Sequence, residues 1–236
     1  MLDVWQIHEF SGEPFGREGQ AVRWVPLEEL TNYPFPAANL PILQAVMLPT
    51  EYLITAEESD EDIFDACLER ALVEDGVRLV QLRAKRLDEA AYLARAERAL
   101  ALCRRYSARL LLNGEPALLE QIDADGIHLT SERLMSLERR PIAEDKWLAA
   151  STHDRPQLEQ AARVGCNFVT LSPLRTTPSH PEVAPLGWHD FQELVERAAM
   201  PVVALGGMTR QCANLARAVG PQGISSSRDF WKMPSA

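Results

Sequence analysis

The chain has 236 residues, enough for one sizeable domain or for one domain and a fragment of another. Hydrophobic residues make up 46% and charged residues 25%, which is the ordinary composition of a soluble globular protein. The formal charge of −10 argues against a general nucleic-acid binder, because such proteins carry a basic face that neutralises phosphates. Any phosphate site must therefore be local.

The spacing of the cysteines and the length of the apolar runs indicate in which cellular compartment the protein resides. Four widely spaced cysteines form no C-x-x-C pair, so we expect small buried hydrophobes in a reducing compartment and no disulfide framework or zinc site. No apolar run approaches the ~20 residues that a membrane-spanning helix needs, and no signal peptide opens the chain. We expect a cytoplasmic protein with no nucleic-acid or membrane partner. The sequence leaves open whether the chain forms a homo-oligomer.

Residues 1–45 differ in composition from the rest of the chain. Their aromatic and turn residues predict two short strands and a helix that starts near Ala37, with too little apolar surface for a separate core. The order G-E…E-G-Q…W-V and then F-P-x-A-N resembles the C-terminal tail of a MutT-type Nudix domain. In that family the residue that matches Asn39 contacts the purine of an oxidised nucleotide, with Phe35 nearby. The metal-holding Nudix box would precede Met1, so we expect a fusion remnant or a start site placed too late, and a helix N-terminal role for Asn39.

Residues 46–236 alternate between apolar runs and amphipathic segments. The runs predict eight strands, at 52–55, 77–82, 108–113, 126–129, 147–150, 168–172, 201–205 and 223–226. Helical spacing of apolar residues recurs at 88–106, 154–164 and 188–198, and a capping box stands at 59–62. This order predicts an α/β fold, a (β/α)8 TIM barrel with an incomplete last helix at 228–236. A doubly wound open sheet is the alternative.

Polar side chains follow the second strand on one face. Gln81, Arg83 and Lys85 stand at a period of two, so they leave the strand end in the same direction. Arginine offers phosphate a planar fork and lysine a point charge, so the three together predict a phosphate site at the mouth of the barrel. Each of them alone is also the ordinary polar end of a strand.

Other strand ends add candidates at the same mouth. Gly206 and Gly207 allow backbone amides to approach a phosphate, and Ser227 and Arg228 would complete that pocket. His153, just beyond Ser151, is the strongest single candidate for acid–base chemistry, because a histidine can exchange a proton near neutral pH, although a loop or cap role is the alternative. Three strand-end candidates remain. His128 is a core or lining histidine, Asn113 is a polar strand end, and His180 lies in a Pro-bounded loop that can form a lid.

Seven segments, taken in order, resemble the thiamine phosphate synthase family, including its thiazole tautomerase (TenI) branch, over residues 51–230. They are YLIT, QLRAK, LLLN, DGIHL, STH, SPLRTTPSH and PVVALGGMT. The synthase joins a pyrimidine diphosphate to a thiazole phosphate, so the resemblance implies a small phosphorylated thiazole or pyrimidine ligand. It places two groups of residues at that ligand: a pyrimidine and diphosphate set of Gln81, Arg83, Lys85 and Asn113, and a phosphate set of Thr177, Ser179, Gly207 and the end of the eighth strand.

Three departures from the family pattern bear on activity. The family has Mg²⁺-binding aspartates where this chain has Gly114 and Arg133, and a lysine in place of His180. Because departure of diphosphate needs its charge neutralised, these changes predict synthase activity weakened by several factors of ten. We expect no metal ligands and no certain cofactor, with Mg²⁺ needed only if synthase activity survives. The tautomerase needs no metal, and the family uses the histidine that matches His153.

The sequence therefore leaves three functions open. The first is an enzyme of thiamine biosynthesis, either a thiamine phosphate synthase (a transferase) or a thiazole tautomerase (an isomerase). The second is a non-catalytic or regulatory module of a Nudix hydrolase that acts on oxidised nucleotides of the 8-oxo-dGTP type. The third is a degenerate barrel that binds no ligand.

Overall fold

The computed structural model describes residues 7, 9–177 and 183–233. Two predicted site residues, Ser179 and His180, lie outside the described residues. No helix within the described part of the chain is both long and apolar enough to cross a membrane.

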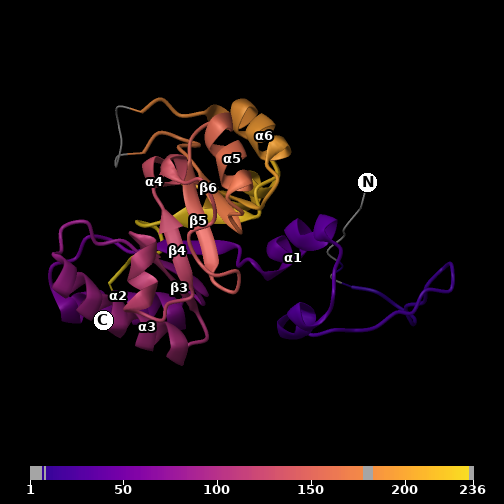
Figure 1. Cartoon of the computed structure of the whole chain (residues 1–236), viewed down its shortest axis with the longest axis horizontal. Helices are drawn as coiled ribbons and strands as arrows, with labels where there is room; N and C mark the ends of the chain where they lie inside the picture. The colour runs from indigo at the N-terminus through magenta and orange to yellow at the C-terminus, as the bar shows by residue number, and fades with distance from the viewer. Residues whose placement is uncertain (1–6, 8, 178–182, 234–236) are drawn as a thin grey trace.

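Eight parallel strands form a closed barrel in which each strand pairs with the next and the last pairs with the first (Figure 1). The closing register places Tyr52 opposite Ser225, so the barrel prediction is confirmed and the open sheet is excluded. The predicted segments overlap all of the strands, which are β1 (Glu51–Ile54), β2 (Leu79–Leu82), β3 (Arg109–Asn113), β4 (Gly126–Leu129), β5 (Trp147–Thr152), β6 (Phe168–Leu171), β7 (Val202–Ala204) and β8 (Gly223–Ser226).

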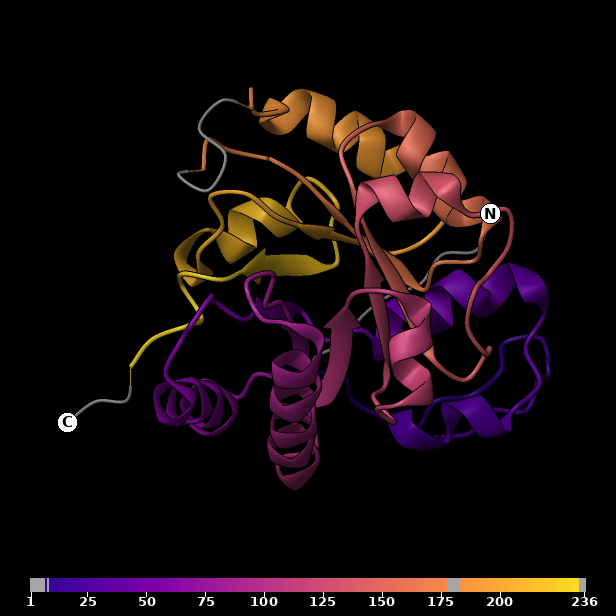
Figure 2. The ribbon, with the colours of Figure 1, turned by 60° about the vertical axis from the view of Figure 1, so that its left-hand side comes forward.

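The helices between the strands lie outside the barrel (Figure 2). They include three that match the predicted segments to within one residue at each end: α3 (Glu89–Arg105), α5 (Arg155–Arg163) and α6 (Gly187–Arg197). The remaining long helix is α2 (Glu61–Val73). The shorter helical connections are η3 (Pro116–Glu120), α4 (Ser131–Ser136), η4 (Arg210–Cys212) and α7 (Ala213–Arg217).

The start of α2 differs slightly from the predicted capping box. Asp60, not Ser59, is the N-cap, and its carboxylate accepts hydrogen bonds from the amides of Asp62 and Ile63. The reason lies one step upstream, because Glu58 accepts the amide hydrogens of both Ser59 and Asp60 and thereby places the turn before the helix.

The chain after β8 forms a turn in place of an eighth helix. The sequence predicted an incomplete last helix at 228–236, but the described residues 227–233 contain no helix. Phe230 is fully buried, and the Trp231 ring packs on Phe64 of α2 with 5.0 Å between the ring centroids. This turn therefore covers part of the barrel wall that an eighth helix would otherwise cover.

An apolar layer fills the N-terminal end of the barrel interior. The Tyr52 and Phe168 rings meet edge to face there, with 5.2 Å between their centroids. Leu48, which follows α1 (Leu40–Met47), is buried against this layer. Helix α1 is held at this end by hydrogen bonds from Gln222 to the Ala45 carbonyl and from Arg109 to the Met47 carbonyl. The base of the barrel is thus closed by a segment that precedes β1.

The segment before α1 contains η1 (Leu27–Asn32) and η2 (Ala37–Asn39) and no strand among its described residues. The expected helix near Ala37 is confirmed, whereas the two expected strands are wrong. An isolated strand pair is marginal in water unless it packs an apolar face. Here the apolar side chains stay exposed, as Trp24 shows with an exposed fraction of 70%, and the segment runs away from the barrel (Figure 1). Asn39 occupies the N-cap position of α1, where its side chain makes no capping hydrogen bond.

Candidate active site at the barrel mouth

Polar side chains form the second layer of the barrel interior, directly above the apolar one. Residues two apart on a strand share a face. A strand with an inward residue in the apolar layer therefore places its next inward residue in the layer nearer the mouth. Phe168 is followed in this way by Thr170, and Ala149 by Ser151. The carboxyl ends of parallel strands meet at one mouth, so this polar layer faces it. Its members are Gln81, Asn113, His128, Ser151, Thr170 and Ser225.

Three members of the interior form a hydrogen-bonded row. The Tyr52 hydroxyl lies 3.0 Å from Nδ1 of His128, and Nε2 of His128 lies 2.9 Å from Oγ of Ser151. Burial lowers the pKa of His128 to about 3 and raises the pKa of Tyr52 well above its ordinary value, so both groups are neutral near pH 7. The sequence placed Tyr52 only as a strand residue. Its alternation with Leu53, which faces the helices, is the signal that could have found it.

His153 lies beyond Ser151 at the end of β5, with its ring exposed at the mouth. Its Nδ1 is 2.8 Å from the Ser172 carbonyl oxygen and 3.3 Å from the Ser172 hydroxyl. A carbonyl oxygen only accepts, so Nδ1 carries the hydrogen, and in the neutral ring the lone pair is then on Nε2. Within the described residues Nε2 has no hydrogen-bond partner, so it is available to a ligand. The backbone amide of His153 donates to Gln157, which fixes the start of α5.

The three side chains expected to converge after β2 lie at different depths. Gln81 is buried inside the barrel, and its Oε1 has no hydrogen-bond partner among the described residues. Arg83, about one-third exposed, forms an ion pair with Glu57 at 3.3 Å on the rim. Lys85 is exposed and lines a pocket of about 420 Å³ that also includes Asn113. Asn113 connects this pocket to the barrel interior, because its side-chain amide donates a hydrogen bond to the His128 carbonyl oxygen.

The turn after β7 packs closely against the turn after β6. Gly206 and Gly207 have φ values of +96° and +66°, a region that side chains rarely tolerate. A β-carbon at Gly206 would lie 2.7 Å from the Pro173 α-carbon, and one at Gly207 would lie 3.0 Å from the Thr176 carbonyl oxygen. The amide of Arg175 donates to the Gly206 carbonyl at 3.2 Å. Glycine is thus required here by close approach of two backbones.

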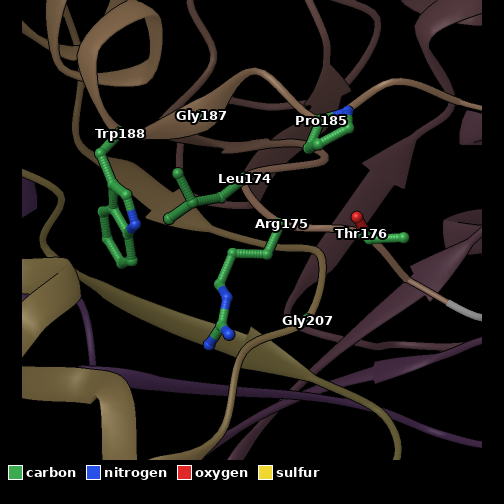
Figure 3. Close-up of a pocket in the computed structure, with 7 residues that line it drawn as sticks. All are labelled: Leu174, Arg175, Thr176, Pro185, Gly187, Trp188 and Gly207. Carbon is green, nitrogen blue, oxygen red and sulfur yellow. The ribbon is translucent and has the colours of Figure 1, made fainter.

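Beside this turn lies a pocket of about 410 Å³ (Figure 3). Arg175 and Trp188 extend in the same direction, Arg175 beside the segment of Gly207, and the guanidinium of Arg175 makes no ion pair with any described residue. The sequence did not single out either side chain, although a cation in the loop after a strand was a usable signal. The other lining residues are Leu174, Thr176, Pro185 and Gly187. Thr177, a predicted phosphate ligand, is the last described residue before the gap in this loop.

The end of β8 contributes a half-buried Ser227 and an exposed Arg228. The Ser227 carbonyl accepts the amide of Trp231 at 2.8 Å, which forms the turn described above. Asp229 accepts the amide of Arg210 at 2.8 Å and so ties this turn to the loop after β7. The two predicted phosphate elements, after β7 and after β8, are therefore joined.

The residues at the family's metal position do not fit a Mg²⁺ ion. Magnesium prefers an octahedron of oxygens that includes carboxylates, and Gly114 and Arg133 supply none. Glu115, the neighbouring carboxylate, is instead paired with Arg133, whose Nε lies 2.5 Å from Oε1. No group of three or more histidine, cysteine, aspartate or glutamate residues within the described chain is arranged to hold a metal.

Residues 51–230 match the family model described as thiamine monophosphate synthase (TMP-TENI). The chain belongs to this family. It is a TenI-like protein of thiamine biosynthesis, as the sequence predicted. These matches give no support to the alternative of a Nudix hydrolase module.

Two relatives and one solved structure illustrate the similarity. A putative thiamine-phosphate synthase 2 of Aquifex aeolicus is 33% identical over 183 residues, which cover 78% of this chain and 98% of that one. A thiamine-phosphate synthase of Thermosynechococcus vestitus is 34% identical over 72% of this chain, but the match spans only 47% of that protein. A thiamine phosphate pyrophosphorylase from Pyrococcus furiosus shares the fold, with a TM-score of 0.63 at 21% identity, over 81% of this chain and 88% of that one.

The family match begins at Glu51, so the expected Nudix tail in residues 1–45 lies outside it and stays a prediction. The expected division into 1–45 and 46–236 likewise stays a prediction. Helix α1 crosses that boundary, since it runs from Leu40 to Met47 and packs on the base of the barrel.

Proposed function

We propose that this protein binds a phosphorylated thiazole at the barrel mouth and moves a proton on it, as an isomerase of thiazole tautomers. The observation that carries the proposal is the fixed orientation of His153. Its Nδ1–H is held by the Ser172 carbonyl 2.8 Å away, which leaves Nε2 as the ring nitrogen that a ligand can reach. The tautomerase branch of the family uses the histidine at this position.

The proposed reaction needs only one proton-transfer group, because an isomerisation has no leaving group and no second substrate. Nε2 of His153 accepts a proton from one atom of the ring system, and the resulting imidazolium returns it to another. The Ser172 carbonyl keeps its hydrogen bond to Nδ1–H in both states, so the ring does not turn over during the transfer. Positioned acid–base groups of this kind contribute about 10²–10⁴-fold in rate.

The ligand's phosphate has several local cations and amides available to it, in spite of the net charge of −10. We assign the phosphate to the turn after β7, where Gly206 and Gly207 bring the backbone close, with the end of β8 beside it. Arg175 provides, next to that turn, a guanidinium that makes no ion pair with any residue the structure describes. The residues assigned to the phosphate are Gly206, Gly207, Thr177, Ser227 and Arg228, and those assigned to the ring or to a pyrimidine ligand are Gln81, Asn113, Ser151, Arg83 and Lys85.

Synthase chemistry fits these residues less well. Departure of diphosphate builds up negative charge that must be neutralised as the bond breaks. At the family's metal position the charge available is that of Arg133, which is already paired with Glu115. We therefore propose that Mg²⁺ is not required and that thiamine phosphate formation is slow or absent.

His153→Ala tests the proposal. The purified protein is given a thiazole phosphate tautomer, and proton NMR follows its isomerisation. We expect the parent to isomerise it and His153→Ala to lose about 10²–10⁴-fold in rate. Affinity for thiazole phosphate by calorimetry should change less than about threefold, because the ring is exposed and the phosphate is held elsewhere. His189→Ala is the matched control, an exposed histidine on α6 whose side chain hydrogen-bonds only to Asp190 among the described residues.

Three outcomes would contradict the proposal. Equal rates in His153→Ala and the parent would remove His153 from the mechanism. A second assay supplies pyrimidine diphosphate, thiazole phosphate and Mg²⁺. Rapid formation of thiamine phosphate in that assay would show a working synthase, and neither product nor isomerisation would exclude both activities.

A further inference from the structure

The row formed by Tyr52, His128 and Ser151 lies inside the barrel and ends at the mouth. Tyr52 and His128 are 0% and 1% exposed, whereas Ser151 is half-buried directly below His153. The two distances in the row, 3.0 and 2.9 Å, are those of ordinary hydrogen bonds. No step proposed above uses Tyr52 or His128.

The direction of the first hydrogen bond follows from the surroundings of Tyr52. Its hydroxyl has no partner among the described residues except Nδ1 of His128. If Nδ1–H donated to the hydroxyl, the hydrogen of the hydroxyl would be buried without an acceptor, which is costly. The tyrosine therefore donates, and Nδ1 accepts. Burial keeps the imidazole neutral, so its single hydrogen is on Nε2.

The second hydrogen bond then has one direction as well. Nε2–H of His128 donates to Oγ of Ser151. The serine oxygen is thereby an acceptor toward the histidine, and its own hydrogen has no other partner in the described part of the chain. Thr170 lies beside Ser151 in the β5–β6 ladder, and its buried hydroxyl oxygen is also without a partner there. Buried polar atoms without partners are rare, so the Thr170 oxygen, next to a serine with a hydrogen left to donate, indicates a place for a ligand.

We propose that Tyr52 and His128 are positioning residues that hold Ser151 as a hydrogen-bond donor toward the mouth. The ligand atom placed over Ser151 is then an acceptor: a ring nitrogen with a lone pair, or a carbonyl or phosphate oxygen. A ring tautomer that presents N–H at this point is disfavoured, so the row selects between tautomers of the ligand. The choice of a thiazole as that ligand rests on the proposed function, whereas the direction of the row does not.

The direction is tested on the ligand-free protein by NMR. Two-bond proton–nitrogen correlations report which ring nitrogen of a histidine carries hydrogen, and His128→Gln identifies the signals of His128. We expect a single Nε2–H tautomer in the parent at pH 7 and a mixture of tautomers in Tyr52→Phe. Tyr92→Phe is the matched control, because it removes a buried hydroxyl that contacts the Leu82 and Asn113 carbonyls, and it should leave His128 unchanged. Hydrogen on Nδ1 in the parent would overturn the proposal, even if Tyr52→Phe failed to fold.

The effect on the ligand is tested by a double-mutant cycle, with calorimetry of thiazole phosphate. We expect Tyr52→Phe to weaken binding about fivefold when Ser151 is present, the size of one neutral hydrogen bond. In the Ser151→Ala background, Tyr52→Phe should change the affinity for thiazole phosphate less than about twofold, because the Ser151 hydroxyl that donates to the ligand is then missing. Ser136→Ala, which removes an exposed hydroxyl on α4, should bind like the parent.

The outcomes separate this inference from the proposed function. Equal weakening by Tyr52→Phe in both backgrounds would mean that Tyr52 does not act through Ser151 and would overturn the proposal. No effect of Ser151→Ala on binding would show that the ligand does not contact this donor and would also overturn it. A parent that binds no thiazole phosphate would refute the proposed function, while the tautomer of His128 would still decide the direction of the row.

Discussion

Gly206→Ala probes the contact between the two turns that form the proposed phosphate site. The residue has a φ of +96°, and an added β-carbon would meet the α-carbon of Pro173 at 2.7 Å. Gly76, after α2, gives a matched comparison. Its φ is +67°, and an added β-carbon would have no atom within 4 Å. Both substitutions force a side chain into the left-handed region, but only that at Gly206 also forces two backbones apart.

The difference between the two variants can be worked out from these contacts. Left-handed backbone costs an L-residue about 1–2 kcal/mol, and this applies to both positions. At Gly206 the contact must open from 2.7 Å to at least 3.4 Å, a shift of 0.7 Å in the Pro173 backbone. That segment is held by hydrogen bonds from Leu174 to Leu205 at 2.9 Å and from Arg175 to Gly206 at 3.2 Å. Weakening both costs about 2 kcal/mol more.

We therefore expect Gly206→Ala to lower the free energy of unfolding by about 3–4 kcal/mol and Gly76→Ala by about 1–2 kcal/mol. Urea unfolding gives both values, and in a domain of this size Tm should fall by about 10 °C and about 4 °C respectively. Gly206→Ala should also weaken binding of thiazole phosphate, whereas Gly76→Ala should not. Equal losses of stability in the two variants would refute the claim that close approach, and not φ alone, requires glycine after β7.

Two further predictions concern charge. Combining Gly114→Asp with Arg133→Asp restores a pair of carboxylates, so Mg²⁺-dependent formation of thiamine phosphate should rise at least about tenfold, and unchanged metal dependence would contradict this account of the lost site. Burial alone would raise the pKa of Asp75, but hydrogen bonds from Arg210 and Arg70 lower it overall. The stability that this carboxylate adds is thus present above its unfolded pKa of about 4 and is lost as the pH falls through its folded pKa. Tm of the parent should therefore fall more steeply than Tm of Asp75→Asn below about pH 4, and parallel curves would disprove this.

The barrel could be predicted from the sequence because its strands are buried on both faces. Such strands read as short apolar runs, and the segments 126–129 and 223–226 were placed with the bounds of β4 and β8. The helices between them carry apolar residues at helical spacing, and aspartates begin three of them: Asp60 caps α2, Asp88 caps α3 and Asp154 caps α5. Local patterns sufficed here because each element buries its own face against its neighbours in the chain.

Local patterns failed where the outcome depends on what lies elsewhere in space. The two strands expected before Ala37 have strand-like residues but no sheet beside them. Arg175 and Trp188 line one pocket although a loop and a helix start separate them in the chain. Gln81, Arg83 and Lys85 share a face at a period of two, yet they differ in depth because the strand ends at Leu82 and the chain then turns outward.

Tyr52 shows why the chemistry of the mouth was harder to predict than its position. Its ring belongs to the apolar layer, edge to face with Phe168, while its hydroxyl reaches His128 in the polar layer above. A sequence pattern sees only an apolar residue in a strand, since the partner is 76 positions away. A substitution that keeps the core well packed, such as Tyr52→Phe, can therefore still change which atom of Ser151 faces the ligand. In this barrel the packing of the base and the hydrogen-bond donors of the mouth are set by the same side chain.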